Sequence, residues 1–294
     1  MNSGANAAKP GDPLPPARRI AVDDVALHVV EHGPEDGPLV ILLHGFPEFS
    51  FGWRRQIGPL AAAGFRVAAP DGRGYHRSSK PQGVRAYGLD ALVADVVGLA
   101  DALGRERVSL VGHDWGGIVA WWAAARHPDR VERLAVLNAP HPAIARPYLL
   151  SHPSQMLRSW YVGFFQIPGL PEALLRADGY AALRRSLRRT SRPGTFGEAD
   201  LDAYARAWSE PGALTGMVNW YRALRDFRPE GPMRVAPPAL LLWGVRDPFL
   251  EIGLAEESLA LCDRGRLVRL EDATHWLHLE EPDRVNRELI GFLR

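Results

Sequence analysis

An aspartate lies at the centre of a glycine-rich turn, where its carboxylate could act as a nucleophile. The sequence Gly-His-Asp-Trp-Gly-Gly at 112–117 follows a predicted strand over 108–111 and precedes a predicted helix over 118–127, so Asp114 occupies a strand-turn-helix elbow. Glycine suits the positions around Asp114 because the turn is tight. Such a turn holds the central side chain above the sheet. A carboxylate there favours attack on an sp³ carbon and formation of an ester. The simpler interpretation of Asp114 is a helix cap.

Two later residues could hydrolyse such an ester. His275 follows the last predicted strand and is the expected general base, because imidazole titrates near neutral pH. Asp247 follows the preceding strand and would orient that base. The alternatives are a packing or capping role for His275 and a turn role for Asp247 before Pro248. His113 is a second candidate base, but its place next to the nucleophile predicts that it points away.

The loop after the predicted strand over 39–43 is expected to form an oxyanion hole. The sequence His-Gly-Phe-Pro at 44–47 would bring the backbone N–H of Phe46 near that of Trp115, where both could face a developing negative charge. We expect the peptide bond between Phe46 and Pro47 to be cis. Aromatic side chains beside the catalytic positions predict an apolar substrate pocket, with internal packing as the alternative: Phe46, Trp115, Phe249 and Trp276.

The candidate residues follow short apolar runs that alternate with helix-like segments. The runs span 39–43, 65–69, 108–111, 134–137, 239–243 and 267–270. This alternation predicts an α/β fold with a mostly parallel sheet flanked by helices and with its chemistry at the carboxyl ends of the strands. Between Asn138 and about Glu230 the alternation stops, which predicts an inserted helical cap. We expect a flexible tail over 1–17, a core over 18–140 and 231–294, and the cap (lid) over 141–230.

Composition excludes several other classes of protein. Of 294 residues, 46% are hydrophobic and 23% are charged, which is ordinary for a globular chain. The formal net charge of +1 favours neither a nucleic-acid partner nor a membrane surface. A lone cysteine, Cys262, excludes an internal disulfide. The first 17 residues hold no apolar run of signal-peptide length, so we expect a cytoplasmic protein. The sequence does not distinguish a monomer from a homodimer.

Two of these motifs, together with the sequence Asp-Gly-Arg-Gly-Tyr at 71–75, resemble the α/β-hydrolase epoxide hydrolases, the soluble epoxide hydrolase family. They are the segments 44–47, 71–75 and 112–117, and the likeness runs from about Val25 to the C-terminus. The segments 161–172 and 219–222 are similar to that family's two tyrosine segments. The chain departs from the pattern at His76, where glycine often follows the Arg-Gly-Tyr segment.

The resemblance implies an α/β-hydrolase fold and conversion of a small-molecule epoxide to a vicinal diol. It implies that Tyr161 and Tyr221 bind the epoxide oxygen, which is chemically reasonable because phenols can donate hydrogen bonds and then a proton to an alkoxide. Asp71 and Arg73 are expected to tie loops together. No cofactor is implied, and although the spacing of His275 and His278 could suit a metal, no third ligand is evident.

Two alternatives to epoxide hydrolysis stay open on the sequence. Haloalkane dehalogenases use the same aspartate and ester, but they usually have asparagine in the place of Phe46. Fluoroacetate dehalogenases have arginine in the place of Trp115, and this chain has neither residue. A non-catalytic binding protein on this fold is less favoured, because it would normally have lost part of the triad.

Overall fold

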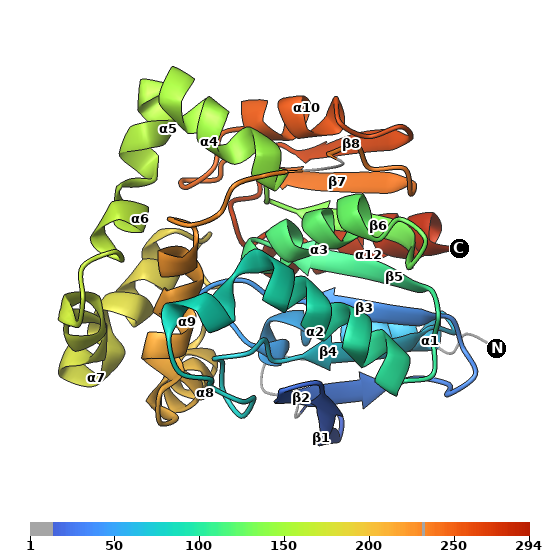
Figure 1. The fold of residues 1–294 in the computed structure, drawn as a ribbon, viewed down its shortest axis with the longest axis horizontal. Helices are drawn as coiled ribbons and strands as arrows, with labels where there is room; N and C mark the ends of the chain where they lie inside the picture. The colour runs from blue at the N-terminus through green and yellow to red at the C-terminus, as the bar shows by residue number, and fades with distance from the viewer. Residues whose placement is uncertain (1–13, 231–232) are drawn as a thin grey trace.

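An eight-stranded sheet forms the centre of the computed structural model, which describes residues 14–230 and 233–294 (Figure 1). The strand order is β1-β2-β4-β3-β5-β6-β7-β8. Strands β3 to β8 run parallel, whereas β2 is antiparallel to both β1 and β4. The strands are β1 Ala17–Val22, β2 Val25–His32, β3 Leu39–Leu43, β4 Arg66–Pro70, β5 Val108–His113, β6 Val131–Leu137, β7 Ala239–Gly244 and β8 Gly265–Leu270. The α/β class and the mostly parallel sheet are therefore confirmed.

The six strands expected from apolar runs are all present, and the two strands at the N-terminus are additional. Buried and half-buried residues alternate only over the first half of β2, 25–28. His28 and Glu31 interrupt its apolar residues, so it gave no continuous apolar run. Most of the expected tail, residues 1–13, lies outside the described residues, and Ala17 already belongs to β1.

Helices cover both faces of the sheet because successive strand residues face opposite sides. On β3, Ile41 packs into one apolar cluster with helices α2, α3 and α10, whereas Leu42 packs into a second cluster with α1 and α12. The helices of this part are α1 Ile57–Ala62, α2 Leu89–Ala102, α3 Trp115–Arg126, α10 Gly253–Leu259, α11 Leu277–Glu280 and α12 Pro282–Leu293, with 3₁₀ turns at Ser50–Trp53 and Val84–Tyr87.

Among the described residues between β6 and β7, six helices gather mainly at one end of the sheet (Figure 1). They are α4 Pro142–Ser151, α5 Pro153–Arg158, α6 Trp160–Phe164, α7 Leu170–Arg189, α8 Glu198–Ser209 and α9 Ala213–Ala223. The indole N–H of Trp208 donates to the carbonyl of Pro47, and that of Trp220 donates to the carbonyl of Arg73. These helices therefore contact the loops that follow β3 and β4. Among the described residues, no helix has the length and apolar character needed to cross a membrane.

Glycine allows the elbow between β5 and α3 to pack closely. A Cβ added at Gly116 would lie 2.1 Å from the carbonyl oxygen of Leu43, and one at Gly112 would lie 2.3 Å from that of Gly116. Helix α3 therefore begins in direct backbone contact with β3. This contact fixes the turn that contains Asp114.

Replacing Gly116 with alanine is expected to lower the free energy of unfolding by about 3 kcal/mol, because the backbone of β3 cannot move away from the new methyl group. Urea denaturation of the purified chain measures this change. Gly163 on α6 is the matched control, since a Cβ there meets nothing within 4 Å. Equal stability of the two alanine variants would contradict the close contact at the elbow.

Candidate active site

Asp114 occupies a strained turn that directs its carboxylate away from the helix that follows. Its backbone has φ 50° and ψ −120°, a region that side-chain-bearing residues rarely adopt. It holds the N-cap position of α3, but its side chain makes no capping hydrogen bond there. The helix-cap interpretation of Asp114 is therefore wrong, and the carboxylate is left for other contacts.

The loop after β3 donates a hydrogen bond to that carboxylate. The backbone N–H of Phe46 lies 2.9 Å from Asp114 Oδ1, and the bond between Phe46 and Pro47 is cis as expected. Trp115 is the first residue of α3 and follows Asp114 directly, so its amide begins the same turn. An oxygen on the Asp114 carboxyl carbon can thus meet a backbone donor without any movement of the loop.

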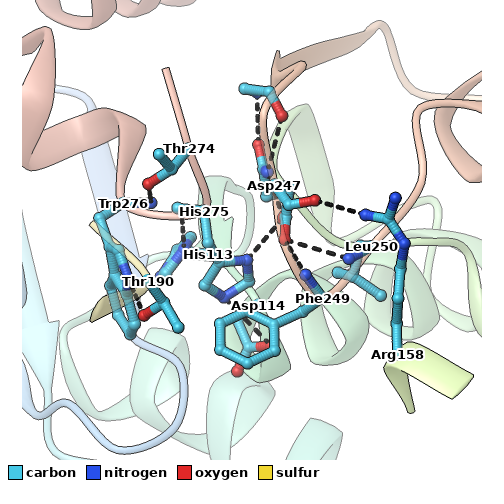
Figure 2. Close-up of polar contacts among 12 residues, drawn as sticks. His113, Asp114, Arg158, Thr190, Asp247, Phe249, Leu250, Thr274, His275 and Trp276 are labelled. Atoms are coloured by element: carbon cyan, nitrogen blue, oxygen red, sulfur yellow. Dashed lines mark hydrogen bonds and ion pairs between the residues drawn. The ribbon is translucent and has the colours of Figure 1, made fainter. Parts of the chain in front are cut away.

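His275 lies between the two carboxylates that the sequence pairs with it (Figure 2). Its Nε2 is 3.6 Å from Asp114 Oδ2, and its Nδ1 is 2.7 Å from Asp247 Oδ2. The backbone N–H groups of Phe249 and Leu250 donate to Asp247 Oδ1 at 2.7 and 3.0 Å. The structure therefore brings together three residues from loops that follow three different strands, in the geometry of a nucleophile, a base and an orienting acid.

The charges around His275 favour its protonated form. Burial alone would lower the pKa of His275, but the negative charge of Asp247, the hydrogen bond to it and the charge of Asp114 raise it to about 9. For Asp247, burial alone would raise the pKa, but His275 and the amide of Asn138 hold it below its usual value. The acid is therefore ionised, and the charge state of His275 depends on whether Asp114 is charged.

A second buried network lies beneath His275. His113 Nδ1 is 3.1 Å from Glu48 Oε2, and its Nε2 is 2.9 Å from the backbone oxygen of His275. The hydroxyl of Tyr204 donates to Glu48 Oε1 at 2.8 Å. Burial alone would raise the pKa of Glu48, but the neighbouring histidines hold it well below its usual value. His113 thus points away from the nucleophile and supports the backbone of the expected base.

Asp71 and Arg73 tie loops together, as expected. Asp71 accepts a hydrogen bond from the backbone N–H of Ser50 and contacts the ring of His76 at 2.9 Å, while Arg73 pairs with Asp95 at 2.6 Å. His76 adopts a positive φ of 38°, which explains why glycine suits this position. The ring of His76 is held by Asp71, so the turn keeps its shape with a larger residue.

Two sets of side chains in the described residues bring potential metal ligands within 4.8 Å of one another: Glu48, His113 and His278, and His28, Asp71 and His76. In the first set, burial lowers the pKa of His278 to about 4, so this imidazole is neutral. Short polar contacts already connect His113 with Glu48 in the first set and both histidines with Asp71 in the second. That the protein needs no metal cofactor stays a prediction.

Tyr161 on α6 and Tyr221 on α9 face the same cavity as Asp114. Their rings are 5.9 Å apart, and Tyr221 also lies edge-on to Trp115 at 5.0 Å. Burial, followed by the charge of Asp114, raises the pKa of both phenols above the ordinary value. Both hydroxyl groups therefore stay protonated near neutral pH and can donate hydrogen bonds.

The cavity that contains these groups has a volume of about 1010 Å³ and a mostly apolar lining. Asp114, Trp115, Tyr161 and Tyr221 line it, together with residues of α4 and of the segment after α9. Phe46 contacts Tyr221 at 5.2 Å between ring centroids, and Phe249 contacts Tyr161 at 5.8 Å. The site can therefore hold an apolar molecule against the carboxylate and the phenols.

Of the four aromatic residues expected in the pocket, Trp115 lines the cavity, and Phe46 and Phe249 pack against its two tyrosines. Trp276 has a different environment. Its indole N–H donates to Thr190 Oγ1 at 3.0 Å, and its ring packs against His275 and Phe196. These contacts place it where the helical segment meets the core. They support the alternative of internal packing for this residue.

Several residues that support the site were not predicted. Asn138 follows β6 and donates to the carboxylate of Asp247. On α5, Arg158 donates to the backbone oxygen of Asp247 and Gln155 to that of Phe249. Asn138 could have been noticed, because it ends an apolar strand as the other site residues do. Glu48 follows the oxyanion loop directly, but nothing in its sequence context shows that it is buried.

Comparison with known proteins agrees with this geometry. Residues 38–282 match the family described as alpha/beta hydrolase fold. The chain is 43% identical over 276 residues to the AB hydrolase superfamily protein YfhM of Bacillus subtilis (strain 168), covering 94% of this chain and 96% of that protein. It is 39% identical to Epoxide hydrolase 4 of Mus musculus, covering 94% and 78%. The crystal structure of Bacillus megaterium epoxide hydrolase with an inhibitor is similar, with a TM-score of 0.87 and 31% identity over 94% of this chain and 99% of that chain.

Proposed function

This chain belongs to the α/β-hydrolase fold family and, within it, to the epoxide hydrolases, and we propose that it converts an epoxide and water to a vicinal diol through an ester on Asp114. The observation that carries the mechanism is a single cavity lined by Asp114 at one side and by Tyr161 and Tyr221. A nucleophile and two hydrogen-bond donors are what the opening of an epoxide requires.

In the first step, a carboxylate oxygen of Asp114 attacks one ring carbon of the epoxide, and the bond between this carbon and the epoxide oxygen breaks. Tyr161 and Tyr221 hydrogen-bond to the oxygen as it becomes an alkoxide, and one phenol supplies its proton. Their place in the cavity with Asp114 supports this role, and both hydroxyl groups are protonated before the reaction. The product of this step is a hydroxyalkyl ester of Asp114.

In the second step, His275 takes a proton from a water molecule, and the resulting hydroxide attacks the carboxyl carbon of Asp114. The N–H groups of Phe46 and Trp115 face the oxyanion that forms. When this intermediate collapses, protonated His275 returns its proton to the leaving ester oxygen and the diol departs, while the carboxyl group regenerated on Asp114 gives up its proton to restore the phenol. The hydrogen bond between Phe46 and Asp114 supports this assignment. Asp247 keeps His275 oriented and stabilises its positive charge.

Formation of the ester favours the neutral form of His275, which the second step needs as its base. With Asp114 ionised, the pKa of His275 is about 9, so the free enzyme holds a protonated imidazole. Ester formation removes the charge of Asp114, whose oxygen lies 3.6 Å from His275 Nε2. The pKa of His275 is therefore lower in the ester than in the free enzyme, which favours the neutral base that the second step needs.

We expect the ester to accumulate as the pH is lowered, because protonation of His275 removes the base of the second step. Once the pH is below the pKa of His275 in the ester, the hydrolysis rate should fall about tenfold per pH unit. Rapid quenching during turnover, followed by mass analysis of the Asp114 peptide, measures the ester fraction at each pH. An ester fraction that is independent of pH would contradict His275 as the base.

The helical segment 141–230 acts in this proposal as a cap that supplies both tyrosines and closes the pocket over the core of 18–140 and 231–294. Phe46, Trp115 and Phe249 are the proposed apolar contacts of the substrate. The cytoplasmic location expected from the sequence stays a prediction, which cell fractionation tests.

Substrate choice tests the proposal as a whole. The purified chain is incubated with racemic styrene oxide and separately with 1-bromobutane, in water enriched in oxygen-18. Diol without halide, with label entering Asp114 over repeated turnovers, is the expected result. Release of bromide would move the assignment to a dehalogenase, and label found only in the diol would exclude the ester.

A further inference from the structure

Gln155 is a buried amide in the helical segment that the proposed reaction does not use. It lies on α5 and is 2% exposed. Its side-chain N–H donates to the backbone oxygen of Phe249 at 2.7 Å, and its side-chain oxygen accepts from the backbone N–H of Glu251 at 2.9 Å. One side chain therefore satisfies two backbone groups of a loop that is 94 residues away in the sequence.

That loop holds the carboxylate that orients His275. The residue whose carbonyl bonds to Gln155, Phe249, donates its own N–H to Asp247 Oδ1 at 2.7 Å. One turn further along α5, the guanidinium of Arg158 donates to the backbone oxygen of Asp247 at 2.8 Å (Figure 2). Helix α5 thus holds the loop at both ends of the short segment that encloses the Asp247 carboxylate.

The same loop contacts the other half of the site. The ring of Phe249 packs edge-on against His275 at 5.1 Å and against Tyr161 at 5.8 Å. Tyr161 belongs to α6, which follows α5 after a single residue, Ser159. Gln155 also donates to the hydroxyl of Ser159 at 3.0 Å. The amide therefore contacts both the turn that leads to Tyr161 and the residue that separates Tyr161 from His275.

We propose that Gln155 is a positioning residue that holds Tyr161 on the cap and the Asp247–His275 pair on the core in one fixed arrangement, through the backbone of Phe249. This inference rests on the proposed function. It adds that ester formation, which uses Tyr161, and ester hydrolysis, which uses His275, both depend on the hydrogen bonds of Gln155. Loss of that support is expected to slow both steps, whereas a purely structural amide would affect only stability.

Gln155→Met tests this, because methionine keeps the length of the side chain and removes its hydrogen bonds. Asn286→Leu is the matched control: Asn286 is also buried, and its amide donates to the backbone oxygen of Arg55 far from the site. Both variants leave a backbone oxygen without its donor, so we expect both to unfold at a lower urea concentration than the original chain. The rates of ester formation and of ester hydrolysis are then measured separately by rapid quenching with styrene oxide.

We expect Gln155→Met to lower both rate constants by about tenfold, because a small misplacement of reacting groups is enough to slow a reaction. Asn286→Leu should leave both rate constants unchanged. The acid limb of the hydrolysis step should also move to lower pH in Gln155→Met, since a looser Asp247 attracts the proton of His275 less strongly. The other charged and titratable groups near His275 are the same in both variants: Asp114, Glu48 and His113.

Original rate constants and pH profile in a folded but destabilised Gln155→Met would overturn the proposal. If this variant does not fold, Gln155→Glu decides the question, since it keeps the acceptor for Glu251 and loses both donors. Slower steps in folded Gln155→Glu support the positioning role, and unchanged steps exclude it. Failure of the proposed function is distinguishable, because the original chain itself would then form no ester.

Discussion

Replacing His275 with glutamine is expected to stop the enzyme as the hydroxyalkyl ester, with the mass of one substrate molecule added to the peptide that contains Asp114. Glutamine keeps a polar side chain of similar reach but cannot take a proton from water. The nucleophile and the two phenols are unchanged, so the epoxide still opens. Loss of the general base should slow hydrolysis of the ester by about 10³-fold.

Mass spectrometry of the intact chain after mixing with styrene oxide measures the adduct, and digestion locates it. The double variant Asp114→Asn/His275→Gln is the control and should show no adduct, because an amide is a poor nucleophile. Multiple turnovers of His275→Gln at the original rate would show that another group activates the water. His113 is then not the substitute, since both of its ring nitrogens already contact Glu48 and the backbone of His275.

The members of this triad could be predicted because each follows a strand of the parallel sheet. Val111, Trp243 and Leu270 end apolar runs, and the first polar or glycine-rich residues after them must lie at the same edge of the sheet. Asp114, Asp247 and His275 meet at that edge. A regular scaffold therefore made it possible to predict contacts between residues far apart in the sequence.

The residues that support the triad could not be predicted in the same way. Glu48 and Tyr204 are 156 positions apart, and they meet because α8 packs over the loop after β3. Gln155 reaches the loop at 247–251 through the irregular path of α4 and α5. Helix packing has no fixed register comparable to that of a sheet, so a single sequence does not show which polar side chains it will bury.

The cap illustrates the same limit at the level of the pocket. The segments at 161–172 and 219–222 pointed to the two tyrosines, whose rings do lie close together. Trp276 was expected in the pocket because it follows His275, yet its indole turns toward Thr190 and Phe196. Because Trp276 follows His275, the position of its backbone could be predicted, but the direction of its side chain could not.

Replacing Tyr161 and Tyr221 together with phenylalanine is expected to lower the rate of ester formation by about 10⁴-fold. Ring opening places a negative charge on the epoxide oxygen in an apolar cavity, and loss of one preorganised donor in such a site typically costs about 10²-fold or more. Each single variant should therefore keep partial activity, because the other phenol still donates. Phenylalanine keeps the packing of both rings, so the fold should be retained.

Single-turnover mixing with styrene oxide measures ester formation in the double variant and in each single variant. Tyr180→Phe is the matched control, since Tyr180 lies in the same helical segment but packs against Trp208. Ester formation at the original rate in the double variant would show that the cap does not activate the epoxide. Because the two phenols serve only the leaving oxygen, ester that does form should still be hydrolysed at the original rate by His275, which separates the work of the cap from that of the core.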